Sequence, residues 1–142
     1  MADKDQALTA SNIKYLLVLE ELSRDTGGVR CVDIADTLGV TKPSVHMMMK
    51  TLKNMELVCK DKYGMVFFTK QGRCLAKQYS KYFKTIDTYF HPIFPKGTDI
   101  KAVACVLLAG LSDKSIQRMC SMMQYEMIEK DKISCNCKQK NF

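Results

Sequence analysis

The sequence predicts a mainly α-helical protein: a winged helix-turn-helix of three helices and a two-stranded β-wing, followed by a helical dimerisation region. Two short helical patterns flank a tight turn at Gly39, and two short β-like runs follow them directly. Beyond the wing, apolar residues again recur at helical spacing. We expect the winged domain at residues 1–72, the helical domain at residues 73–128 and a polar, flexible tail at residues 129–142.

The first helix is expected at residues 11–23. Its apolar residues cover more than one face, so this helix must be buried on more than one side. They are Ile13, Leu16, Leu17, Leu19 and Leu22. The sequence Asp-Thr-Gly-Gly at residues 25–28 is typical of a loop. A second helix at residues 32–38 then ends at Gly39, because glycine readily caps a helix C-terminus.

A third helix, expected to run to Asn54, begins with two local signals. Thr41 is a good N-cap, and Pro43 fits the first turn, where its missing N–H does no harm. One face of this helix carries apolar residues at i, i+3, i+4 and i+7, the spacing of core positions. These residues are Val45, Met48, Met49 and Leu52. The opposite face is therefore available to a partner.

The β-wing is expected from two apolar runs, residues 57–60 and 65–69, around a turn at residues 61–64. β-Branched and aromatic residues favour strands, and Gly64 suits the turn between them. Two helices joined by a tight turn and followed directly by a hairpin are typical of a winged helix-turn-helix.

After the wing, residues 71–91 predict one long helix that ends at Pro92 and Pro95. Its apolar residues alternate steps of four and three, the spacing of a helix–helix seam. They are Leu75, Tyr79, Tyr82, Ile86 and Tyr89. Thr98-Asp99 can cap a further helix that runs through Leu111, and Ser112 can cap the last one.

The net charge of +7 is concentrated in one segment. Between Lys42 and Lys84 the chain has ten Lys and Arg against two acidic residues, Glu56 and Asp61. This segment carries +8, so the rest of the chain carries −1. Concentrated positive charge indicates a polyanionic partner, here double-stranded DNA, because the charge coincides with the third helix and the wing.

We therefore expect the third helix to enter a major groove, with Lys50 and His46 as candidate base contacts and Met47 as an apolar third. The alternative is that Lys50 contacts phosphate only. Lys60, Lys62 and Tyr63 of the wing are expected on the DNA backbone, as are Thr69 and Lys70 at its far end. The full set of candidate DNA-binding residues is Thr41, Lys42, Pro43, Ser44, His46, Met47, Lys50, Lys53, Lys60, Lys62 and Tyr63.

At this point a family resemblance emerges. VDIADTLGVTKPSVHMMMKTLKNMELV and KYGMVFFTKQGRCLA, including the pattern T-x-x-G-x-x-L, resemble the DNA-binding domain of the diphtheria-toxin-repressor and manganese-transport-regulator family. The resemblance extends over about residues 11–125, and the winged-helix part is shared with regulators of the multiple-antibiotic-resistance type. It implies a homodimeric, metal-activated transcriptional repressor whose metal ligands come from the first helix, the long helix and the next helix.

Carried over by motif, the family's metal-ligand positions fall on Ser11, Lys14, Phe83, Cys105, Leu108 and Ala109. Divalent manganese or iron needs carboxylate and imidazole donors. Five of these positions offer no usable donor, and the thiol of Cys105 alone is not a site. We therefore predict no metal site at these positions, no cofactor, and a regulator that manganese or iron does not activate.

The cysteines indicate a reducing compartment, because seven is an odd number and no export signal precedes them. Cys135 and Cys137 form a possible thiol site that would need a third thiol, from Cys120 or a dimer partner. The longest apolar run, residues 102–111, is about half the length of a membrane span. A cytoplasmic protein without a membrane partner is expected. Since no catalytic arrangement is present, an enzyme is not.

The leading hypothesis is thus a homodimeric, sequence-specific DNA-binding regulator that acts as a repressor. A second hypothesis is a regulator of the multiple-antibiotic-resistance type, controlled by a small ligand or by thiol oxidation. Aromatic residues of the long helix, Tyr79, Tyr82, Phe83, Tyr89 and Phe90, could line its pocket. A third is a protein–protein adaptor that does not bind DNA. Only the first two predict DNA affinity that falls steeply with salt.

Overall fold

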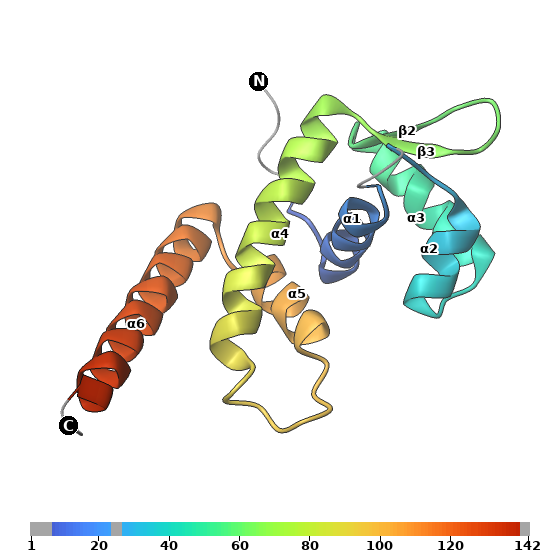
Figure 1. Ribbon diagram of the computed structural model, residues 1–142. Coiled ribbons are helices and arrows are strands. Elements are labelled where there is room, and N and C mark those ends of the chain that lie inside the picture. Colours follow the sequence, from blue (N-terminus) through green and yellow to red (C-terminus); the bar gives the residue numbers. More distant parts are fainter. Residues whose placement is uncertain (1–6, 24–26, 140–142) are drawn as a thin grey trace. The chain divides into compact units, whose positions relative to one another are not determined.

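The described part of the chain forms six α-helices and three short β-strands (Figure 1). A computed structural model describes residues 7–23 and 27–139, with side chains as far as residue 134. The chain divides into two compact units, residues 1–81 and 82–142, and the boundary between them falls inside helix α4, Lys70–Phe90. The expected fold class, a mainly helical winged helix-turn-helix followed by helices, is confirmed.

Three helices of the first unit lie where the sequence predicts them. Helix α1 spans Ala10–Leu22, α2 spans Cys31–Leu38 and α3 spans Lys42–Asn54. Gly39 ends α2 in the left-handed conformation, with a φ of 66°. Thr41 then caps α3, because its side-chain oxygen accepts a hydrogen bond from the backbone N–H of Ser44.

The sheet of the first unit has three strands rather than the two expected from the sequence. Strands β1 (Gly28–Val29), β2 (Val58–Lys60) and β3 (Val66–Phe68) are antiparallel in the order β1-β3-β2. The interpretation of Gly28 as a loop residue is therefore wrong, since Gly28 pairs with Phe67. A strand of two residues is too short to show the alternation by which strands are recognised in a sequence.

Side chains of α1, α2, α3 and the sheet meet in one hydrophobic core. Val45, Met49 and Leu52, three of the four expected core residues of α3, are at most 1% exposed. The fourth, Met48, is partly buried against the same core. As predicted, α1 is buried on more than one face, with Ile13, Leu16, Leu17 and Leu19 all at most 5% exposed.

The end of the wing is fastened to the start of α4 by Thr69. Its hydroxyl donates to the backbone oxygen of Glu56 at 2.7 Å and accepts from the backbone N–H of Gly72 at 3.0 Å. Gly72 lies directly against the backbone carbonyl of Leu57, so a side chain at this position would overlap that oxygen. In the T-x-x-G pattern of the sequence, the threonine therefore caps α4, and the glycine allows the backbone of α4 to approach that of Leu57.

In the second unit, α5 spans Ile100–Gly110 and α6 spans Asp113–Gln139. Both begin at the predicted caps, since Asp99 accepts from the N–H of Ala102 and Ser112 accepts from the N–H of Ser115. Helix α6 continues through the residues expected to form a flexible tail after position 128. The polar composition of those residues concealed the helix, because no apolar stripe marks it there.

Helix α6 lies along the second half of α4. The hydroxyl of Tyr89 donates to a carboxylate oxygen of Glu126 at 2.9 Å, and the amide of Gln124 donates to the hydroxyl of Thr85 at 3.3 Å. Three side chains of α6, those of Ile116, Cys120 and Met123, are buried. Within the described ranges, no helix is both long and apolar enough to cross a bilayer.

Candidate nucleic-acid interface

The face of α3 opposite the core is open to solvent. Every predicted DNA-contacting residue of this helix is exposed: Lys42, Pro43, Ser44, His46, Met47, Lys50 and Lys53. Met47 is 73% exposed, although its neighbours Met48 and Met49 pack against or into the core. Such exposure is unusual, because methionine side chains are more often buried. The N-cap is rigid, because the hydroxyls of Thr41 and Ser44 are also hydrogen-bonded to each other at 2.8 Å. The helix therefore exposes a cationic surface, while its opposite face is held in the hydrophobic core.

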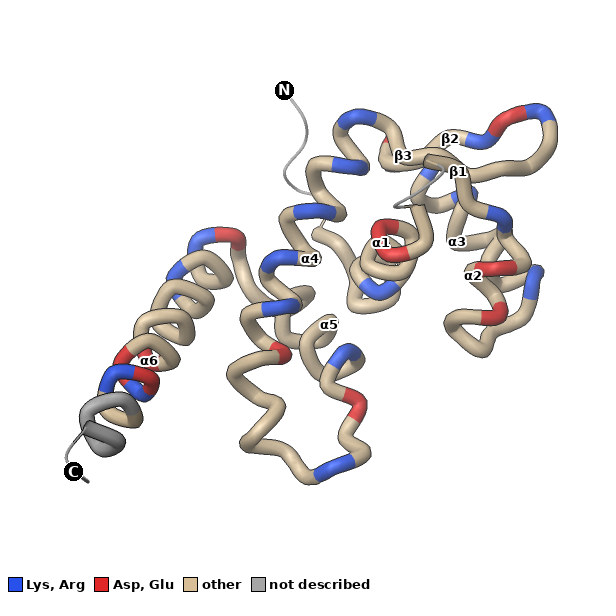
Figure 2. The backbone as a smooth tube through the Cα atoms, viewed as in Figure 1, with Lys and Arg blue, Asp and Glu red and all other residues tan. Residues whose placement is uncertain are grey.

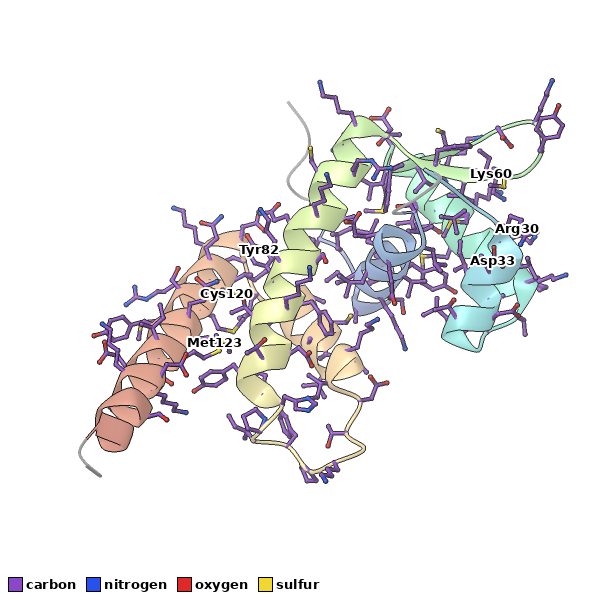
Figure 3. The ribbon with its side chains drawn as sticks, viewed as in Figure 1. Arg30, Asp33, Lys60, Tyr82, Cys120 and Met123 are labelled. Atoms are coloured by element: carbon purple, nitrogen blue, oxygen red, sulfur yellow. The ribbon has the colours of Figure 1, made fainter. Side chains whose placement is uncertain are left out.

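One contact connects this surface to the wing. The Nζ atom of Lys60, on β2, lies 3.3 Å from Nδ1 of His46 on α3 (Figure 3). In this pair the ammonium can only donate, so the imidazole nitrogen accepts. The structure thus brings together two of the predicted DNA-binding residues, which are fourteen positions apart in the chain.

The tip of the wing is a tight turn ordered by Asp61. Its Oδ1 accepts hydrogen bonds from the backbone N–H groups of Tyr63 at 2.8 Å and Met65 at 2.9 Å. Gly64 takes a φ of 81°, which glycine adopts without strain. The turn holds Tyr63 79% exposed, with the ammonium of Lys62 5.1 Å from the centre of its ring. An exposed aromatic ring beside a cation suits contact with a nucleic-acid backbone.

Arg30 is a further cation that the sequence interpretation did not include. It lies at the N-terminus of α2, where its Nε atom is 3.2 Å from a carboxylate oxygen of Asp33 (Figure 3). The signal available in the sequence was an arginine and an aspartate three residues apart at a helix start. The side chain of Arg30 is 67% exposed and that of Asp33 is 43% exposed, so this ion pair contributes little to stability and leaves the guanidinium accessible.

Figure 2 shows how the cations are distributed along the backbone. Lys and Arg mark the wing and follow one another along α4, and acidic residues occur on α1, on α2, at the wing tip, near the end of α4 and along α6. From Lys42 to Lys84 only Glu56 and Asp61 are acidic, and Asp61 is committed to the turn it orders. The segment that runs from α3 through the wing into α4 is therefore strongly positive.

The positions that the family resemblance assigns to metal ligands carry few suitable donors. On α1, Ser11 is exposed and Lys14 is half-buried. In the second unit, the ring of Phe83 lies beneath the ammonium of Lys101, 5.6 Å from its centre, while Cys105 and Leu108 are buried. Ala109 is half-buried and has no donor atom in its side chain. Over the part of the chain that the structure describes, no three His, Cys, Asp or Glu side chains come close enough to hold a metal ion.

The candidate thiol site at Cys135 and Cys137 lies outside the side chains that the structure describes. Cys120, its suggested third member, is 6% exposed, and burial raises the pKa of its thiol. A raised pKa favours the protonated thiol, which neither binds metal nor attacks as a nucleophile. Cys59 and Cys74 are exposed, whereas Cys31 and Cys105 are buried.

Several known proteins are similar to this chain in sequence or in structure. Residues 13–62 match the model of the IclR helix-turn-helix domain. The transcriptional regulator MntR of Escherichia coli O6:H1 is 38% identical over 64 residues, which are 45% of this chain and 41% of the relative. MntR of Salmonella typhimurium is 33% identical over the same length. The manganese regulator SloR has a similar structure, with a TM-score of 0.68 and 28% identity over 80% of this chain and 54% of that one. Over the matched residues the chain is homologous to MntR and to the manganese regulator SloR.

Two further structures delimit what this homology covers. ScaR with bound Zn²⁺ superimposes with a TM-score of 0.60 and 29% identity over 80% of this chain and 54% of that one. IdeR of T. acidophilum, at 21% identity and a TM-score of 0.59, shares the fold. The matches span only about two fifths of the MntR sequences and half of the SloR chain. The MntR relatives are transcriptional regulators, and SloR is a manganese regulator.

Proposed function

We propose that this protein binds double-stranded DNA in the cytoplasm as a homodimeric, sequence-specific transcriptional regulator that represses by occluding a promoter. The observation that carries the proposal is the division of α3 into two faces. Val45, Met49 and Leu52 fix one face in the core, and the opposite face exposes Lys50 and its neighbours. A helix held in this way can enter a major groove while its other face stays packed in the core.

The roles of the individual residues follow from their positions. His46, Met47 and Lys50 lie on the exposed face of α3 and would meet base edges. Lys60 and Lys62, with Tyr63, are on the wing and would meet the sugar-phosphate backbone. The contact between Lys60 and His46 supports this assignment, because a wing held against α3 would present the surfaces of the wing and of α3 to DNA together. The homology with MntR supports the same assignment of function.

A second copy of the chain is supported by the exposed apolar side chains of the second unit. Val106 on α5 is 66% exposed, and α6 exposes Met122, Tyr125 and Ile128 to between 54% and 63%. Exposed apolar surface of this kind marks protein–protein contact sites. A symmetric pair of copies would cover it and would also place two α3 helices on one duplex.

We further propose that manganese or iron does not activate this regulator. The supporting observation is chemical, since Phe83, Leu108 and Ala109 offer no ligand atom and Lys14 is a cation. Hard divalent cations require oxygen and imidazole donors, which these positions do not supply. The ammonium of Lys101 over the ring of Phe83 adds positive charge at one of these positions.

The test is binding of the reduced, purified protein to the DNA upstream of its own gene. It is titrated in chelator and again with added Mn²⁺, Fe²⁺ or Zn²⁺. We expect equal affinity in all four conditions and a steep loss of affinity as salt is raised. Binding that requires added metal would overturn metal independence but not DNA binding. Binding that is absent throughout, or insensitive to salt, would favour an adaptor.

A pair of variants tests the assignment of α3. Lys50→Ala should reduce the preference for the selected sequence over a scrambled one by about 1–3 kcal/mol, because a base contact is lost. Lys114→Ala, at an exposed position of α6, removes the same charge and should leave the preference unchanged. If Lys50→Ala weakens both sequences equally, Lys50 contacts phosphate and the sequence is read by other residues.

A further inference from the structure

A row of cations runs along one face of α4. Lys70, Arg73, Lys77 and Lys81 are separated by steps of three, four and four residues, which places them on the same side of the helix. Lys70, Lys77 and Lys81 are exposed, and Arg73 is half-buried. The row extends about 16 Å along the helix axis, at 1.5 Å per residue. Figure 2 shows Lys and Arg following one another along α4. We call these four residues the α4 cation row.

The α4 cation row opposes the stability of its own helix. Like charges three or four residues apart repel each other, and α4 contains no acidic residue before Asp87. Lys70 and Arg73 also occupy the first turn of the helix, where its dipole disfavours positive charge, and this turn has no acidic residue. A binding partner that neutralises Lys70, Arg73 and Lys77 would remove the repulsion among them.

The row begins at the wing and shares its support. The guanidinium carbon of Arg73 lies 5.4 Å from the centre of the Phe68 ring on β3. Lys70 directly follows Thr69, whose hydroxyl is bonded to the backbone oxygen of Glu56. All four cations belong to the same compact unit as α3 and the wing. The row is therefore a continuation of the candidate interface rather than a separate patch.

The chemistry around the row favours DNA over a membrane. A helix that binds a lipid surface places large apolar side chains beside its cations. Among the described residues, none of the exposed large hydrophobic side chains lies on α4. The row is instead flanked by Gln71, Cys74 and Gln78. Phosphates of one DNA strand recur every 3.4 Å of axis, so about five would lie along 16 Å of duplex.

We propose that the α4 cation row is a second DNA-contacting surface, which binds backbone phosphates beyond those reached by α3 and the wing. The inference rests on the proposed DNA-binding function and adds a site to it. The row carries no sequence information, because it meets phosphates rather than base edges. Its role is to strengthen binding to any duplex long enough to reach it.

The experiment compares the wild type with the variant Lys70→Gln/Lys77→Gln/Lys81→Gln on a random-sequence duplex of about 30 base pairs, between about 50 and 200 mM salt. Gln forms helices well, so α4 should persist in the variant. The matched control is Lys96→Gln/Lys114→Gln/Arg118→Gln, which removes the same charge from exposed positions of the second unit.

We expect the α4 variant to lose about tenfold or more in affinity and its salt slope to fall by about 0.9 for each phosphate released. The control should keep the wild-type slope, and Lys70→Arg/Lys77→Arg/Lys81→Arg should retain binding. An α4 variant with an unchanged slope would overturn the second surface while leaving the proposed function intact. A wild type without salt-dependent binding would overturn the proposed function itself. Loss of binding to phosphatidylserine vesicles, with DNA binding unchanged, would assign the row to a membrane.

Discussion

The side-chain amide of Asn12 donates a hydrogen bond to the thioether sulfur of Met48 across 3.2 Å, and so connects the start of α1 to α3. Asn12 is 5% exposed and also forms a reciprocal cap with Thr9. Met48 lies between the core face of α3 and its exposed face. The angle at which α3 is presented therefore depends on a polar contact, as well as on the apolar packing of Met49 and Leu52.

Replacing this sulfur should be more harmful than replacing its neighbour. Met48→Leu keeps the volume but leaves the buried amide of Asn12 without its acceptor, so we expect a loss of about 1 kcal/mol or more in the free energy of unfolding. Met47→Leu makes the same chemical change at a side chain that is 73% exposed and should stay within about 0.5 kcal/mol of the wild type. Urea unfolding measures both. Equal midpoints would show that the Asn12 contact contributes nothing.

Gly72 should not tolerate any side chain. Gly72→Ala places a Cβ on the backbone oxygen of Leu57, and neither backbone can move without breaking the Thr69 cap, so we expect a loss of more than about 3 kcal/mol. Gly110→Ala is the matched control, because nothing lies near a Cβ at the end of α5. That variant should be neutral or slightly more stable. Thermal melts distinguish the two, and similar melts would remove the steric argument.

Much of the fold could be predicted because its signals are local. Thr41, Pro43 and Gly39 fix the ends of two helices through their own backbone preferences, so the structure reproduces these boundaries closely. Strand β1 could not be predicted, since Gly28 is extended only because the ring of Phe67 and strand β3 lie beside it. The helix after Glu129 was missed because periodicity reports a buried face, which polar residues do not reveal.

The candidate site, like the fold, could be predicted from the sequence only in part. The exposed face of α3 follows from helical periodicity alone, once the core residues are assigned. The pairing of His46 with Lys60 does not, because it depends on how the wing folds back over fourteen residues. The α4 cation row was visible as charge, yet its relation to the wing emerged only from the contact between Arg73 and Phe68.

The wing tip offers a test in which charge and order have opposite effects. Asp61→Ala removes a negative charge from the proposed interface, which alone would strengthen binding to DNA. It also removes the acceptor for the N–H groups of Tyr63 and Met65, so the turn that presents Tyr63 becomes disordered. We expect the loss of order to dominate and the affinity to fall about threefold to tenfold, as for the loss of about 1 kcal/mol.

Asp61→Asn is the matched control for this effect. The amide oxygen can still accept both hydrogen bonds while the charge is gone, so affinity should equal or exceed that of the wild type. Fluorescence anisotropy with a labelled duplex measures all three proteins. An increase in affinity with Asp61→Ala would mean that the order of the turn does not matter for binding.

A charged side chain introduced on α5 should dissociate the proposed dimer. Val106 is 66% exposed on a helix with no charged residue after Lys101, so Val106→Glu would bury a carboxylate wherever a second copy covers this face. We expect a monomer by sedimentation equilibrium and at least tenfold weaker binding to DNA. Lys114→Glu, at an exposed position of α6, controls for the change of charge. A Val106→Glu protein with unchanged mass in solution would place the contact between copies elsewhere.

The alkaline limit of stability should depend on Tyr89. The hydrogen bond from its hydroxyl to Glu126, together with the charge of that carboxylate, raises the pKa of Tyr89 above its ordinary value of 10.0. The folded state therefore favours the neutral phenol. The stabilisation is fully present below pH 10 and is lost as the pH rises through the raised folded value. Tyr89→Phe has no such contribution to lose.

Urea midpoints of the wild type should consequently fall more steeply above pH 10 than those of Tyr89→Phe, while the two proteins run parallel between pH 7 and 9. Glu126→Gln retains an acceptor but not the charge, so its curve should lie between them. Tyr15, whose pKa is raised by burial, is present in all three proteins and sets a common background. Identical slopes for the wild type and Tyr89→Phe would mean that the phenol of Tyr89 ionises equally well in the folded and unfolded states, and that its bond to Glu126 does not persist in solution.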